Sequence, residues 1–133
     1  MKATNASPTK GLNHGSLVDA CDNSGAQVVK VVAVKRSKTV KSRYPSAGVG
    51  DMVLVSVKKG TKEMRKTVVP AIVVRQRKEY RRPDGTRIKF SDNAVIILKD
   101  EKGNPKGTVI KGPIAKEVVN RWPPIAKIAS MVV

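Results

Sequence analysis

Short apolar stretches, most of them rich in valine, alternate with polar segments over the first hundred positions of the chain. They predict five strands, at residues 17–21, 26–34, 52–57, 71–74 and 94–98. Side chains branched at Cβ favour extended backbone, and the segments between the stretches contain the glycine, asparagine, aspartate and proline residues typical of turns. The pattern therefore predicts a mainly β fold, a small five-stranded β-barrel, in which the first two strands form a hairpin.

The last two predicted strands are joined by a segment with a strong turn signal, Pro83-Asp84-Gly85. Proline presets φ, aspartate caps its own backbone, and glycine adopts the positive φ that other residues avoid. After the turn, Ile88 and Phe90 alternate with basic residues, which is the period of a half-buried strand. We therefore predict a projecting β-ribbon hairpin, with its base in the core and its basic tip standing away from it.

The period changes in the C-terminal part of the chain. Ile114, Val118 and Trp122 recur at helical spacing, and Pro123 follows directly. Because proline cannot continue a helix, we predict one that stops before it. Residues 125–133 fit either a second short helix or an extended tail. The barrel should thus carry short C-terminal helices.

The length of 133 residues is most simply one domain over 1–133, large enough to bury a core without metals or disulfides. We divide it into a flexible polar N-terminal arm (1–15), the β-barrel with its ribbon (16–100) and a C-terminal helical region (101–133). The arm has no apolar signal core, and no apolar run approaches the about 20 residues that span a bilayer. A single cysteine excludes an internal disulfide and suits a reducing compartment, so we expect a cytoplasmic protein without a membrane partner.

The charge of the chain indicates its partner. The net charge is +17, from 27 basic and 10 acidic residues, and 17 of the 27 lie in three segments, 35–43, 58–66 and 75–89. One such run alone is as well explained by a solvated face, but three runs around one barrel favour contact with the phosphates of RNA or DNA. The candidate RNA-binding residues are Lys35, Arg36, Lys38, Lys41, Arg43, Tyr44, Lys58, Lys59, Lys62, Arg65, Lys66, Arg75, Arg77, Lys78, Arg81, Arg82, Arg87 and Lys89.

The chain has only four aromatic residues besides its histidine: Tyr44, Tyr80, Phe90 and Trp122. Barrels that bind single strands, such as cold-shock domains, stack bases on aromatic side chains. We assign Phe90 and Trp122 to the core, which leaves Tyr44 and Tyr80 as stacking candidates. The scarcity favours RNA of fixed shape and weakens the alternative of a free RNA-binding chaperone of the cold-shock barrel type.

Enzymatic chemistry has little support. The only histidine, His14, lies in the arm, and Cys21 lies in an apolar strand, where it is best explained as a small buried side chain. Asp19, Asp22 and Asp51 border turns or strand ends, where aspartate is common. We therefore predict no enzyme, no cofactor and no metal site.

Four blocks of the sequence carry a family resemblance: ACDNSGAQVVKVV, SAGVGDMVLVSVK, PAIVVRQRKEYRRPDGTRIKFSDNAVIIL and GTVIKGPIAKEV. They resemble the universal large-subunit ribosomal protein family numbered fourteen in the L series, from about Leu17 to the C-terminus. The third block is the most specific, because its turn and apolar residues keep a fixed spacing. The N-terminal extension, the lysine-rich connector and the two prolines after Trp122 resemble the archaeal and eukaryotic branch.

This resemblance implies a five-stranded barrel with a projecting ribbon and short C-terminal helices. It also implies a structural constituent of the large ribosomal subunit that binds large-subunit rRNA beside neighbours from the L-three and L-twenty-four-e families. At the subunit interface, the family contributes to bridges with small-subunit rRNA in translation.

In the family, the C-terminal region is also the docking place of anti-association factors, which in archaea and eukaryotes are of the initiation-factor-six type. Bacterial relatives have a Thr-Arg pair ahead of a Gly-Pro, whereas Val109 replaces the arginine here, so the choice of factor stays open. We expect Ile114 and Val118 to face the barrel and the polar residues of the helix to point outward. The candidate residues for protein or bridge contacts are Thr108, Lys116, Asn120 and Arg121.

Overall fold

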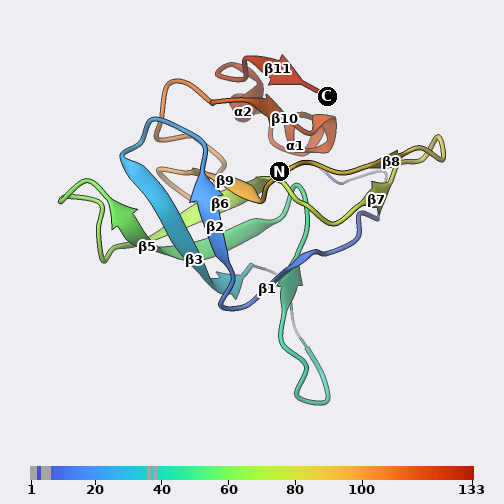
Figure 1. The fold of residues 1–133 in the computed structure, drawn as a ribbon, viewed down its shortest axis with the longest axis horizontal. Helices are drawn as coiled ribbons and strands as arrows, with labels where there is room; N and C mark the ends of the chain where they lie inside the picture. The colour runs from blue at the N-terminus through green and yellow to red at the C-terminus, as the bar shows by residue number, and fades with distance from the viewer. Residues whose placement is uncertain (1–2, 4–6, 36, 38) are drawn as a thin grey trace.

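Five strands close into a barrel in the order β2, β3, β5, β6 and β9 (Figure 1). The computed structural model describes residues 3, 7–35, 37 and 39–133, so the candidates Arg36 and Lys38 lie outside the described residues. Neighbouring barrel strands are antiparallel except β2 and β9, which are parallel. A ring with an odd number of strands needs such a parallel pair to close. The strands are β2 (Leu17–Ala20), β3 (Ala26–Val34), β5 (Met52–Gly60), β6 (Val68–Arg75) and β9 (Ala94–Ile97). The predicted mainly β, five-stranded barrel is confirmed.

Valine side chains fill the inside of the barrel. Val29 and Val31 of β3 and Val53 and Val55 of β5 are fully buried in one cluster, as alternate residues that point to the same face. The pairing of β3 with β5 shifts register at three places. Such irregularities bend and twist long strands, and they allow these two to curve around a small barrel.

Strand β6 is apolar on both faces because it separates two cores. Ala71 and Val73 pack inside the barrel, whereas Ile72 and Val74 belong to a second cluster on its outside. Strand β9 is divided in the same way between the two clusters. The unbroken apolar runs in the sequence thus result from a C-terminal layer that covers this side of the barrel.

The C-terminal layer consists of β10 (Pro113–Ile114), α1 (Lys116–Arg121), α2 (Pro123–Ala126) and β11 (Met131–Val132), and Figure 1 shows it above the barrel. The predicted helix exists, but Ile114 belongs to a strand that pairs in parallel with β11. Trp122 is buried between the two helices, and its Nε1–H donates to the Gly50 carbonyl at 2.8 Å. The final segment therefore combines both alternatives, a short helix and an extended end.

Strands β7 (Tyr80–Arg81) and β8 (Arg87–Ile88) form the predicted ribbon, which extends to the right in Figure 1. Gly85 has φ of +93° at the turn, and its N–H donates to the Arg82 carbonyl at 2.9 Å. Asp84 accepts hydrogen bonds from the hydroxyl and the N–H of Thr86, and these bonds lower the pKa of its carboxyl group. The turn chemistry read from the sequence is confirmed.

The segment expected to be a flexible arm is attached to the barrel from Thr9 onward. Strand β1 (Leu12–Asn13) pairs antiparallel with β4 (Ser46–Ala47), and Leu12 is buried in the barrel cluster. The Gln76 side-chain amide donates to the Thr9 carbonyl at 2.7 Å. One buried leucine and a short strand pairing thus connect the chain to the barrel before residue 15.

Candidate RNA-binding surface

The three basic segments project from the barrel in different directions. In Figure 1 the loop before β4 extends below the barrel, the connection between β5 and β6 lies at the left, and the ribbon lies at the right. Most of the predicted contacts on these segments are exposed: Lys41, Arg43, Tyr44, Lys58, Lys59, Lys62, Arg65, Lys66, Arg77, Lys78, Arg81, Arg87 and Lys89. Three separated clusters of accessible cations suit a folded polyanion that approaches the protein from several sides.

Acidic neighbours neutralise little of this charge. Lys35 is half-buried and pairs with the exposed Glu101 at 2.7 Å. On the ribbon, Glu79 lies 3.9 Å from Lys78 and 3.8 Å from Arg87, in contacts open to solvent. Exposed ion pairs contribute only about 0–1 kcal/mol, so these cations can exchange a carboxylate for a phosphate at small cost.

Arg75 differs from the other candidates because it is buried. Its Nε and Nη2 donate to the two carboxylate oxygens of Asp92 at 2.9 and 3.1 Å. Its Nη1 donates to the carbonyls of Lys111 and Pro113 at 2.9 and 3.0 Å. This guanidinium joins the end of β6 to the segment that leads into β10, and only 8% of the residue is exposed. The structure therefore gives Arg75 a structural position away from the exposed basic surface.

Arg82 is also internal, and the expectation that its side chain lies outside the core is wrong. Its Nε donates to Glu117 Oε1 at 2.8 Å, and the two side chains are only 9% and 7% exposed. Its Nη2 donates to the Val133 carbonyl at 2.6 Å. Burial alone would lower the pKa of Arg82, but its hydrogen bonds with Glu117 and Tyr80 raise it. The pair fastens the ribbon to helix α1, so the two arginines beside the turn have different surroundings.

Tyr80 belongs to the same buried cluster and cannot stack on a base in this structure. It is 1% exposed, and its hydroxyl donates to Glu117 Oε2 at 3.0 Å. Burial, and then the charge of Glu117, raise the pKa of Tyr80 to about 12. Trp122 is buried and Phe90 half-buried against the second core, as expected, whereas Tyr44 is 77% exposed. Among the four tyrosine, phenylalanine and tryptophan residues, Tyr44 is therefore the one that is exposed to a partner.

In the C-terminal region (101–133), three of the four predicted contacts are exposed. Thr108 is held by Asn23, whose amide donates to the Thr108 hydroxyl at 2.8 Å, while Lys116 and Asn120 lie on the outer side of α1. Arg121 does not point outward as expected, because its Nη1 donates to Asp51 Oδ1 at 3.0 Å and its side chain is only 22% exposed. This arginine ties α1 to the turn before β5.

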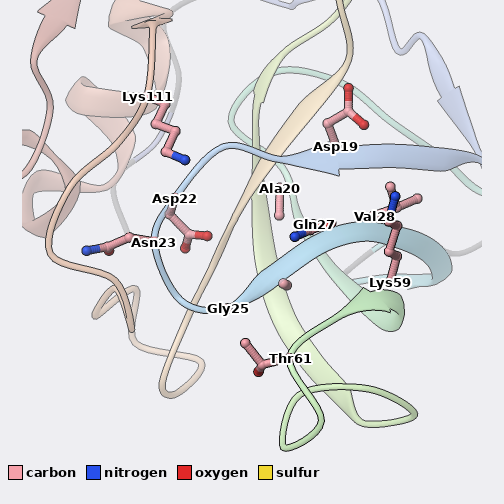
Figure 2. A pocket seen from close by; sticks show the side chains of 11 residues that line it. Asp19, Ala20, Asp22, Asn23, Gly25, Gln27, Val28, Lys59, Thr61 and Lys111 are labelled. Carbon is pink, nitrogen blue, oxygen red and sulfur yellow. The ribbon is translucent and has the colours of Figure 1, made fainter.

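A surface hollow of about 450 Å³ lies beside the turn between β2 and β3 (Figure 2). Lys59 and Lys111 line it together with Asp19 and Asp22, from three separate parts of the chain. Asp22 is already engaged, since its Oδ2 accepts the Ile97 N–H at 2.9 Å and its Oδ1 accepts the hydroxyl of Ser24 at 2.8 Å. The carboxylate of Asp22 thus supports the geometry of the turn and of strand β9.

Potential metal ligands are not gathered in the described part of the chain. The described residues contain no group of three or more histidine, cysteine or acidic residues able to hold a metal ion. Cys21 is buried, its thiol lies 3.6 Å from the Val95 carbonyl, and burial raises the pKa of this thiol to about 12. Nor does any helix in the described part of the chain combine the length and apolar character needed to cross a bilayer.

Comparisons with known proteins identify a family. The family model of ribosomal protein L14p/L23e matches residues 11–133. The chain is 54% identical to the large ribosomal subunit protein uL14 of Nanoarchaeum equitans and 53% identical to that of Haloarcula marismortui, in each case over the full length of both chains. The family is one of structural ribosomal proteins and not of enzymes. This chain belongs to the ribosomal protein L14p/L23e family.

Proposed function

We propose that this protein is a structural constituent of the large ribosomal subunit and binds large-subunit rRNA mainly through its phosphates. The observation that carries the proposal is the set of exposed lysines and arginines on the three projections of the barrel. Its relatives are named as large-subunit ribosomal proteins, so we expect this protein to be located in the cytoplasmic ribosome. Neutralised phosphates release counterions, so cations on several projections bind a folded RNA without reading its sequence.

A free chaperone of the cold-shock type has less support. Such barrels present several aromatic side chains on one face for successive bases. Among the described residues, Tyr44 is the only exposed member of the four tyrosine, phenylalanine and tryptophan residues. The barrel side formed by β6 and β9 is covered by the C-terminal layer and is closed to RNA.

The C-terminal layer supports a second contact. Lys116 and Asn120 of α1 are exposed there, and so are the apolar residues Met131 and Val132 of β11; Thr108 is exposed in the segment before β10. We infer that this surface meets small-subunit rRNA at bridges, neighbouring proteins of the L-three and L-twenty-four-e families, or an initiation-factor-six-type anti-association factor. Val109 is 52% exposed, so the position that carries arginine in bacterial relatives is available to such a factor.

Sedimentation of a cell lysate tests the first contact. A structural constituent should migrate with large subunits and remain with them after a high-salt wash. In an assembled particle it can dissociate only if many phosphate contacts break at the same time. A chaperone should appear in light fractions or leave the particle in salt. Migration away from the large subunit before the wash would refute the proposal.

Charge reversal on α1 tests the second contact. Lys116→Glu should leave incorporation into the large subunit normal but weaken joining with the small subunit or docking of the factor, because the side chain is exposed on the C-terminal layer. Lys59→Glu, on a basic projection, is the matched control and should weaken RNA binding instead. Normal joining and normal factor docking with Lys116→Glu would contradict the assignment of this surface.

A further inference from the structure

Two aromatic rings from distant parts of the sequence lie against each other next to the β1–β4 pairing. The rings of His14 and Tyr44 are nearly parallel, with an interplanar angle of 10° and centroids 6.0 Å apart. The β1–β4 pairing sets this arrangement: Asn13 lies opposite Ser46, and the His14 N–H donates to the Pro45 carbonyl at 3.3 Å. Both side chains are exposed, and Tyr44 keeps 77% of its surface open despite the contact.

The loop that leads to Tyr44 is held in an unusual backbone conformation. Lys41 and Ser42 have φ of 59° and 60°, in the left-handed region that most residues other than glycine avoid. The Nε of Arg43 donates to the Val40 carbonyl at 3.4 Å across this turn. Strained backbone of this kind is concentrated at binding sites, where it fixes the direction of side chains.

We propose that His14 and Tyr44 form a stacking platform for one unpaired nucleobase of the RNA. This proposal rests on the proposed RNA-binding function and adds to it a ligand that is not a phosphate. An exposed tyrosine ring in a soluble protein costs free energy unless a partner covers it, and a nucleobase is a flat surface of matching size. The base comes from a bulge, a loop or a chain end, since bases inside an RNA helix are stacked on each other.

The charges around the platform suit this ligand. Lys41 and Arg43 are exposed on the same loop, within the chain segment that ends at the tyrosine. They bind the phosphates on either side of the unpaired nucleotide, while the rings bind its base. An aromatic ring stacks on all four bases, so the platform selects for an unpaired base rather than for a sequence.

Two synthetic RNA duplexes test the proposal with the full-length protein. One is blunt and fully paired, and the other is identical except for a single bulged 2-aminopurine, whose fluorescence falls when it stacks. The variants are Tyr44→Ala, Tyr44→Phe and His14→Ala, with Val40→Ala as the control, since Val40 is 72% exposed on the same loop. Thermal melting checks that each variant is folded.

For the bulged duplex, Tyr44→Ala should weaken binding about 5- to 150-fold, the range for the loss of one stacked base, and should remove the quenching. His14→Ala should lose part of the same effect, and Tyr44→Phe and Val40→Ala should behave as the wild type. The blunt duplex should bind all variants equally. An equal effect of Tyr44→Ala on both duplexes, or none on either, would overturn the platform. Failure of the wild type to bind either duplex at low salt would refute the RNA-binding function itself.

Discussion

Replacing Arg82 by alanine should destabilise the fold while leaving the basic surface unchanged. The substitution removes the two hydrogen bonds between this guanidinium and Glu117, at 2.8 and 3.4 Å, and the one to the Val133 carbonyl at 2.6 Å. Glu117 then keeps the hydrogen bond from the Tyr80 hydroxyl, in a site where its side chain is 7% exposed. A buried carboxylate without its cation is the largest part of the expected cost.

The size of the effect follows from this burial. Breaking a buried ion pair by removing one partner costs about 3–5 kcal/mol, whereas an exposed surface substitution usually stays within about 0.5 kcal/mol. For a domain of this length, about 4 °C of melting temperature corresponds to each kcal/mol, so the melting temperature should fall by about 12–20 °C. Replacing the whole cluster, as Tyr80→Phe, Arg82→Met and Glu117→Leu together, should regain most of the loss because no polar group is left unpaired.

Calorimetry or circular dichroism measures these changes, and Arg81→Ala is the matched control. Arg81 is its exposed neighbour, so its alanine variant should melt as the wild type does but bind RNA more weakly. Arg82→Ala, studied below its melting temperature, should bind RNA with unchanged affinity. A fall of less than about 4 °C for Arg82→Ala, together with weaker RNA binding, would show that this arginine acts at the surface and refute the reasoning.

Two further predictions concern the cores. Burial raises the pKa of the Cys21 thiol from 9.0 to about 12 and that of Tyr80 from 10.0 to about 12, so their contribution to stability is fully present below pH 9 and is lost as the pH rises toward 12. Alkaline titration of the melting temperature checks this, and a flat profile above pH 9 would contradict it; maleimide should label Cys21 only in denaturant. Gly103→Ala should destabilise more than Gly85→Ala, because both have positive φ but the new Cβ of the former would lie 2.6 Å from the Trp122 ring. Equal unfolding free energies of the two variants would show that the Trp122 ring moves aside for the new Cβ at no measurable cost.

The five barrel strands and the ribbon turn could be predicted because their signals are local. Alternation, runs of valine and a Pro-Asp-Gly turn each act within a few residues of the chain. The spacing of apolar residues predicts helix α1, but it also includes Ile114, which lies in strand β10. A buried residue in a short strand just before a helix falls at the same interval as a buried residue within it, so periodicity does not separate the two.

The surroundings of the arginines could not be read from the sequence. Arg82 meets its carboxylate 35 positions along the chain, and Arg75 meets Asp92 after 17 positions. Gln76, which is fully buried and binds Thr9 and Val49, gave no signal either. Which cation in a basic run points inward depends on the folded arrangement of distant segments. The contact between the rings of His14 and Tyr44 also depends on it, because the pairing of β1 with β4 brings them together.

The dependence of RNA binding on salt tests the central claim most directly. If the three basic segments neutralise about 6–10 phosphates, the affinity of the full-length protein for structured large-subunit rRNA should fall by roughly 10³ to 10⁵ between 50 and 200 mM salt. Removing one exposed cation, as in Lys59→Ala, should reduce the slope of log affinity against log salt by about 1, while Arg75→Ala should leave that slope unchanged in protein that remains folded. Affinity that does not change with salt, or a slope that depends on the buried arginine and not on the exposed lysine, would contradict the account.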